Sequence, residues 1–281
     1  MHRVYMRART NFRRDGQMNS RNLLLAGALA ACATAHADVT VNTTTSGKAS
    51  IMNVGGDGAN YIKGKRMRTD SMVGGRSVSL IIDIDNLRFV ELDDKKKSAT
   101  ITPLASIADE LAKVGVGAMQ ATLTKTAQSK TVSGMPCTVH DIRVTLPFTP
   151  VGEPGQGMDM NMVLSGTVCL SASAPGLADY QGFYRAAADS GFIFGNPAVA
   201  KSPTGAAQAR AYAGLTKKMA EAGMALESHV TISAIGDNPM SAMMGKLAAS
   251  DITTVVTKVE VGDVPADRFD VPVGYKVKTQ K

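Results

Sequence analysis

Short strand-like segments separated by polar turns follow one another over residues 39–102. The segments are rich in β-branched residues or alternate apolar with polar side chains, as half-buried strands do. The turns are too short to hold a crossover helix, so successive strands should be antiparallel neighbours. This pattern predicts an antiparallel meander. Its expected strands cover residues 39–45, 51–54, 60–68, 77–83, 87–92 and 99–102.

The stretch Gly55-Gly56-Asp57-Gly58 is expected to be one of the turns, because glycine adopts positive φ at little cost. It is not a phosphate-binding loop, since no Gly-Lys-Ser/Thr follows and no helical pattern begins there. Asp83-Ile84-Asp85-Asn86 lacks the later glycine and glutamate of a calcium loop and is also expected to be a turn.

Apolar residues recur at helical spacing in residues 105–126, 175–190, 206–222 and 240–249, with further strand-like segments between and after them. Strands follow one another without regular helical crossovers, which argues against a doubly wound parallel sheet. We therefore expect an α+β fold: a strongly curved antiparallel sheet, an unclosed half-barrel of about ten strands, with helices packed on its concave side.

The N-terminal region has the features of an export signal. Arg21 supplies a positive charge, residues 23–31 form an apolar run, and Ala35-His36-Ala37 fits a small-x-small cleavage site. The apolar run is shorter than the roughly 20 residues that cross a bilayer. We expect residues 1–37 to be an N-terminal extension and signal peptide, with Met1 or Met18 as the start, and residues 38–281 to be one exported domain.

A second processing route is open. Leu29-Ala30-Ala31-Cys32 fits the motif in which a cysteine is acylated and becomes the new N-terminus. Cleavage after Ala37 would leave the protein free in the periplasm, whereas lipidation of Cys32 would tether it to a membrane. The sequence alone does not choose between these routes.

The basic charge of the chain belongs mostly to its N-terminal region. The chain has 31 Lys+Arg and 24 Asp+Glu, and residues 1–37 hold six of the arginines and one of the aspartates. Residues 38–281 therefore carry a charge close to neutral. Nucleic-acid binding needs basic residues clustered in the folded domain, so we expect no nucleic-acid partner.

The cysteines point to the same compartment. Loss or modification of Cys32 with the signal leaves Cys137 and Cys169, an even pair in an oxidising environment where disulfides persist. We predict a bridge between them. Two buried, reduced thiols are the alternative.

No reactive constellation stands out. After residue 37 only His140 and His229 remain, neither has a partner at zinc-ligand spacing, and Cys137 and His140 should point to opposite faces of a strand. There is no Gly-x-Ser-x-Gly motif. We expect no catalytic residue, no metal and no cofactor, and hence a protein that is not an enzyme.

Methionine is the unusual component of the composition, with 16 residues and no tryptophan. Because its side chain is unbranched and polarizable, methionine lines surfaces that accept variable apolar shapes, although it also fills ordinary cores. Residues 158–164 alternate with their apolar members on one face. The candidate cavity-lining residues are Met158, Met160, Met162, Leu164, Met219 and Met243.

Several segments resemble an exported bacterial family with a domain of unknown function. They are residues 61–70, Ile81-Ile82-Asp83, residues 92–97, Gly134-Met135-Pro136-Cys137, Gly166-Thr167-Val168-Cys169, Pro175-Gly176 and residues 269–275. That family is similar to the LolA/LolB-like lipoprotein carriers, and the resemblance implies their unclosed β-barrel covered by helices around an apolar cavity. No lipoprotein-binding residue is transferred, because function depends on sites more than on folds.

We therefore expect a periplasmic or envelope carrier that holds a lipophilic ligand, either a small molecule with an acyl chain or an acylated protein. The alternative is a structural or sensory envelope module that binds another protein through sheet edges or the loop at residues 191–205. Contact with a membrane is expected only through lipidation of Cys32. The oligomeric state is not predicted.

Overall fold

The computed structural model describes residues 37–49, 52–73, 76–104, 120–148, 160–190, 203–235 and 249–280. All of them belong to one compact unit, His36–Lys281. Cys32, Met158 and Met243 therefore lie outside the described residues, as do residues 105–119 and 240–248 of two expected helices.

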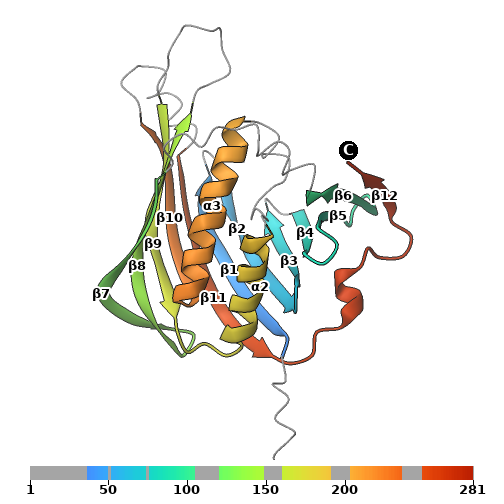
Figure 1. The fold of residues 1–281 in the computed structure, drawn as a ribbon, viewed down its shortest axis with the longest axis horizontal. Coiled ribbons are helices and arrows are strands. Elements are labelled where there is room, and N and C mark those ends of the chain that lie inside the picture. The colour runs from blue at the N-terminus through green and yellow to red at the C-terminus, as the bar shows by residue number, and fades with distance from the viewer. Residues whose placement is uncertain are drawn as a thin grey trace, which may run out of the picture. The chain divides into compact units, whose positions relative to one another are not determined.

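The unit is built on one unclosed sheet of twelve strands in the order β12-β6-β5-β4-β3-β2-β1-β11-β10-β9-β8-β7 (Figure 1). Every neighbouring pair is antiparallel except β12 and β6, which are parallel. The strands are β1 (Val39–Ala49), β2 (Met52–Lys63), β3 (Arg66–Val73), β4 (Arg76–Asp83), β5 (Arg88–Asp93), β6 (Ser98–Pro103), β7 (Gln120–Val132), β8 (Met135–Phe148), β9 (Met160–Ser171), β10 (Met224–Ile235), β11 (Ser250–Val261) and β12 (Lys276–Thr279).

Two helices, α2 (Leu177–Asp189) and α3 (Pro203–Ala222), lie across the same face of the sheet (Figure 1). Helix α2 buries Phe183 and Ala187 in an apolar core with strand residues. Five of these strand residues face one another from β1 to β5 and are at most 5% exposed: Val39, Ile62, Met67, Ile82 and Phe89. Helix α3 buries Leu215 in a second core with Ile142, Val144, Leu164, Val168 and Leu170. The expected α+β sheet with helices on one face is thus present at this level of detail.

The opposite face of β4–β6 is also covered. The segment after β11, with the short 3-10 helix η2 (Ala266–Phe269), packs there and forms the outer core from Ile81, Val90, Leu92, Ala99, Val264 and Phe269. Successive strand residues point to opposite faces, so Ile82 reaches the α2 side while Ile81 reaches the outer core. This outer layer was not predicted.

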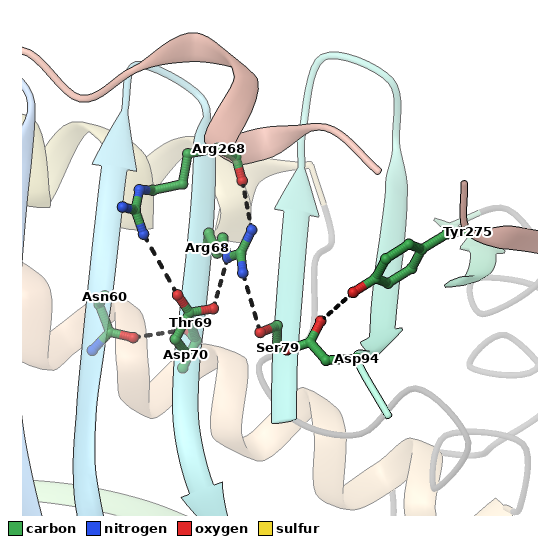
Figure 2. A network of polar contacts seen from close by, with 8 residues as sticks. All are labelled: Asn60, Arg68, Thr69, Asp70, Ser79, Asp94, Arg268 and Tyr275. Atoms are coloured by element: carbon green, nitrogen blue, oxygen red, sulfur yellow. Dashed lines mark hydrogen bonds and ion pairs between the residues drawn. The ribbon is translucent and has the colours of Figure 1, made fainter. Parts of the chain in front are cut away.

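A polar network fastens the same segment to β3 (Figure 2). Arg68 donates to the carboxylate of Asp70 at 2.6 Å, to the hydroxyl of Ser79 at 3.3 Å and to the main-chain carbonyl of Arg268 at 3.1 Å. The Arg268 guanidinium lies 3.7 Å from the other carboxylate oxygen of Asp70 and 4.0 Å from the centre of the Tyr61 ring. The C-terminal segment is therefore held by charge as well as by apolar burial.

The expected turn at Gly55–Gly58 is wrong, because these residues lie inside β2 and pair with Thr43–Ser46 of β1. The glycines serve close approach: a Cβ on Gly55 would lie 3.0 Å from the carbonyl oxygen of Thr45, and one on Gly56 2.7 Å from the Cβ of Met72. The turn lies instead at Gly64 (φ 56°), which divides the single strand expected over residues 60–68 into β2 and β3.

The helix expected over residues 105–126 is wrong at its C-terminal end, since residues 120–126 belong to β7. Their pairing with β8 supplies hydrogen bonds that the helical apolar spacing could not reveal. Helices α2 and α3 agree with the expected segments to within a few residues. The described residues form twelve strands where about ten were expected, and β12, in parallel beside β6, is one that the expected meander did not include.

Candidate ligand cavity

Of the predicted cavity-lining residues, the structure describes the side chains of Leu164 and Met219. Leu164 is 6% exposed and belongs, with Met219 packed against it, to the core beneath α3. Met160 and Met162 lie on β9. The assignment of these residues to a ligand therefore stays a prediction.

A cavity of about 490 Å³ lies elsewhere, where β7, β8 and β9 meet the C-terminal end of α3. This volume is within the range of roughly 300–1,000 Å³ that small-molecule sites occupy. Its lining joins apolar groups to a few polar ones. The lining residues are Lys125, Ser129, Pro136, Cys137, Thr138, His140, Leu170, Ala172, Ser173 and Ala222.

A bulge in β7 shapes one wall of this cavity. Lys125 is opposite His140 and Ser129 is opposite Thr138, so residues 126–128 of β7 face Val139 alone. The hydroxyl of Thr126 donates to the carbonyl of Val139 at 2.8 Å and accepts from the main-chain N–H of Gln128 at 3.1 Å. The extra residues bend β7, as bulges do, and Lys125 and Ser129 lie on either side of the bulge.

His140 supplies the cavity with an imidazole on a rigid strand. Its side chain is 8% exposed, and Nδ1 lies 3.0 Å from the carbonyl oxygen of Thr138. A carbonyl only accepts, so Nδ1 carries a proton and donates it to this hydrogen bond. Among the described residues no group bonds Nε2, which leaves this nitrogen for a ligand.

The predicted disulfide is confirmed. Cys137 and Cys169 are bonded, with an S–S distance of 2.08 Å, and the bridge joins β8 to β9 beside the cavity. Both cysteines are buried, so the bridge belongs to the wall and to the core at once.

A second, smaller cavity of about 170 Å³ lies under α2, lined by Tyr180, Tyr184 and residues of β1, β2, β10 and β11. The two tyrosine rings are 4.5 Å apart, and the Tyr184 hydroxyl is 3.9 Å from the sulfur of Met67. Burial away from water raises the pKa of Tyr180 and raises the pKa of Tyr184 well above its usual value. Both side chains are therefore neutral phenols under physiological conditions.

Sequence reasoning did not select Lys125 or His140, although one indication was present. His140 is in phase with Ile142 and Val144, both buried, while Asp141 and Arg143 between them are exposed. A histidine at an inward position of an alternating strand marks a polar group facing the interior. The bulge that brings Lys125 beside it has no comparable pattern.

Searches against protein-family models and against curated proteins find no match to this chain. Within the described ranges, no helix is both long and apolar enough to cross a bilayer. In that same part of the chain, no group of three or more His, Cys, Asp or Glu side chains could hold a metal ion.

Proposed function

We propose that this protein is a periplasmic or envelope carrier with a LolA-like half-barrel, and that it binds a lipophilic ligand with an anionic head in the 490 Å³ cavity. The observation that carries the proposal is the composition of the cavity wall. Pro136, Leu170, Ala172 and Ala222 offer apolar surface, while Lys125 and His140 face each other across one rung of the β7–β8 ladder.

The two parts of the wall have different roles. Apolar contact with an acyl chain contributes about 25 cal/mol for each Å² removed from water, which supplies affinity without shape specificity. The Lys125 ammonium, which has no ion-pair partner among the described residues, attracts a carboxylate or phosphate head. The Nε2 of His140 accepts a hydrogen bond when neutral and donates one when protonated.

Two further features support the proposal. The unclosed sheet with two helices on one face agrees with the half-barrel that the sequence resemblance implies. The disulfide persists in oxidising compartments such as the periplasm.

The first experiment is native mass spectrometry of protein isolated from the periplasmic fraction, followed by lipid extraction. Titration with the fluorescent fatty acid cis-parinaric acid then gives an affinity. We expect Ala172→Trp, which fills the cavity from an exposed position, to weaken binding at least about tenfold. Lys125→Ala should cause a smaller loss. Ala178→Trp and Lys218→Ala, on exposed helix positions that do not line the cavity, are the matched controls. Protein that is repeatedly empty and does not bind the probe would contradict the proposal.

A second candidate function, binding of another envelope protein, rests on β7. This strand of 13 residues ends the sheet and pairs with β8 alone among the described strands. Its other edge pairs with no strand among the described residues and would accept a strand added by a partner. Proline at Thr122 or Thr124 would block such addition. Loss of a partner from envelope extracts, with cis-parinaric acid binding unchanged, would favour this second function.

A further inference from the structure

A basic corner forms where the C-terminal strand meets the β5–β6 turn. We define it by five exposed lysines: Lys95, Lys96, Lys97, Lys276 and Lys278. The main-chain N–H of Lys276 donates to the carbonyl of Lys97 at 2.8 Å, and β12 continues in parallel beside β6 with Lys278 next to Thr100. Residues about 180 positions apart in the chain are therefore fixed side by side.

The acidic groups near this corner only partly offset its charge. Asp93 is bound to Lys96 at 2.8 Å, and Lys96 holds the pKa of Asp93 below its usual value. The Tyr275 hydroxyl donates a hydrogen bond to the carboxylate of Asp94 at 2.6 Å, as Figure 2 shows. Glu91 on β5 is opposite Thr100, the neighbour of Lys278, and adds a third carboxylate. Three carboxylates thus lie near five ammonium groups. The corner stays positive although residues 38–281 together are close to neutral.

Exposed apolar side chains accompany this charge. Val273, in the turn before β12, is fully exposed, and Val277 on β12 is 55% exposed. The main-chain N–H of Tyr275 donates to the carbonyl of Pro272 at 3.3 Å, which closes the turn that presents Val273. Val273 projects three residues before Lys276, close to the basic corner in the sequence, while Val277 points to the face of β12 opposite Lys276 and Lys278.

We infer that the basic corner docks the protein on an anionic lipid bilayer, with the lysines over the headgroups and Val273 in the interfacial region. Clusters of four to eight basic residues bind anionic membrane surfaces, and each adds to the attraction within a Debye length. A bilayer fits better than a small anion because the lysines are exposed and form no enclosed site. This contact is independent of acylation at Cys32 and of the ligand cavity.

The test is sedimentation of the purified full chain with vesicles of phosphatidylcholine mixed with phosphatidylglycerol, and with vesicles of phosphatidylcholine alone. We expect binding to the anionic vesicles only, and a decrease as salt is raised. Lys95→Gln, Lys97→Gln, Lys276→Gln and Lys278→Gln together should weaken binding roughly 100-fold. The control variant of equal net charge combines Lys48→Gln, Lys65→Gln, Lys218→Gln and Lys258→Gln, all at exposed positions elsewhere, and should bind like the wild type.

Val273→Asp tests whether the projecting aliphatic side chain contributes to vesicle binding. Its side chain makes no buried contact, so folding should be unchanged in a thermal melt, while vesicle binding should fall about tenfold. Ile235→Asp, at another exposed aliphatic position, is the matched control. Equal binding to both vesicle types, equal loss in the two lysine variants, or full binding by Val273→Asp would each overturn the inference. Retention of cis-parinaric acid binding by the docking variants separates this result from the proposed function.

Discussion

The two ends of the sheet are covered differently. Strands β4 and β5 have buried residues on both faces, in the α2 core on one side and in the outer core on the other. The second half of strand β8 is covered on one face, by α3: Ile142 and Val144 are buried, whereas Asp141 and Arg143 are exposed. The 490 Å³ cavity lies at the β7–β9 end of the sheet, and the basic corner lies at the other end, where β12 itself is exposed.

The difference shows how one sheet can hold two kinds of surface. A strand with both faces buried has a continuous apolar run, as Leu80-Ile81-Ile82 has, and packs with little free space. A strand with one buried face keeps alternation and can be bent by a bulge without losing a second layer. Packing on two faces thus leaves little free space around β4 and β5, whereas the bulge in β7 leaves space beside β8.

The largest effect should come from removing the centre of the outer core. Phe269 is 2% exposed, and Arg66 lies 5.0 Å from its ring centre. Phe269→Ala should lower the free energy of unfolding by about 3–5 kcal/mol, measured by urea denaturation. Cis-parinaric acid binding should persist below the denaturation range. If Phe269→Ala weakened cis-parinaric acid binding but left the free energy of unfolding unchanged, the two ends of the sheet would not differ as described.

The corresponding change at the cavity end is removal of the disulfide. Cys137→Ala with Cys169→Ala should lower the free energy of unfolding by about 2–4 kcal/mol, because the unfolded chain is no longer constrained by the bridge. Binding of cis-parinaric acid should also weaken, since Cys137 is part of the wall. Reduction of the wild-type protein by dithiothreitol, followed by the same titration, provides the comparison. Unchanged binding of cis-parinaric acid would show that the ligand site does not depend on the disulfide.

A smaller effect is expected from the network on β3. Arg68→Met leaves Asp70 and the buried hydroxyl of Ser79 without their donor, which should cost about 1–3 kcal/mol of unfolding free energy. Lys258→Met, which removes an exposed ion pair with Glu260, is the control and should change stability little. Equal effects of the two variants would mean that charge does not fasten the C-terminal segment.

The smallest effect is expected on the stability of the protein at alkaline pH. Because burial raises the pKa of Tyr180 and Tyr184, the unfolded chain releases its phenol protons first, and stability falls as pH rises above about 10. Tyr184→Phe should make this decline shallower by about 1.4 kcal/mol per pH unit, measured by urea denaturation at several pH values. A parallel decline in the variant would show that Tyr184 ionises freely in the folded protein.

Local patterns predicted the local parts of this molecule. The hairpins of β4–β6 follow from their turns, α2 and α3 from their apolar spacing, and the Cys137–Cys169 bridge from an even cysteine pair. The remaining features depend on partners distant in sequence. Gly56 is needed because Met72 approaches it, and β7 is a strand because β8 lies beside it. No single segment of the sequence predicts that His140 lies opposite Lys125, or that the C-terminal segment forms the outer core.

The pairing of β1 with β11 has a consequence for how the chain acquires its structure. Val39 is opposite Val261, so the second strand from which β1 draws hydrogen bonds is made about 220 residues after β1. Closing such a long loop costs conformational entropy, and folding rates fall as contacts become more distant in sequence. An emerging chain would present β1 with one edge unpaired for most of its synthesis. Such a chain stays incompletely folded until its C-terminal strands arrive, which is the condition in which a polypeptide can still be threaded across a membrane.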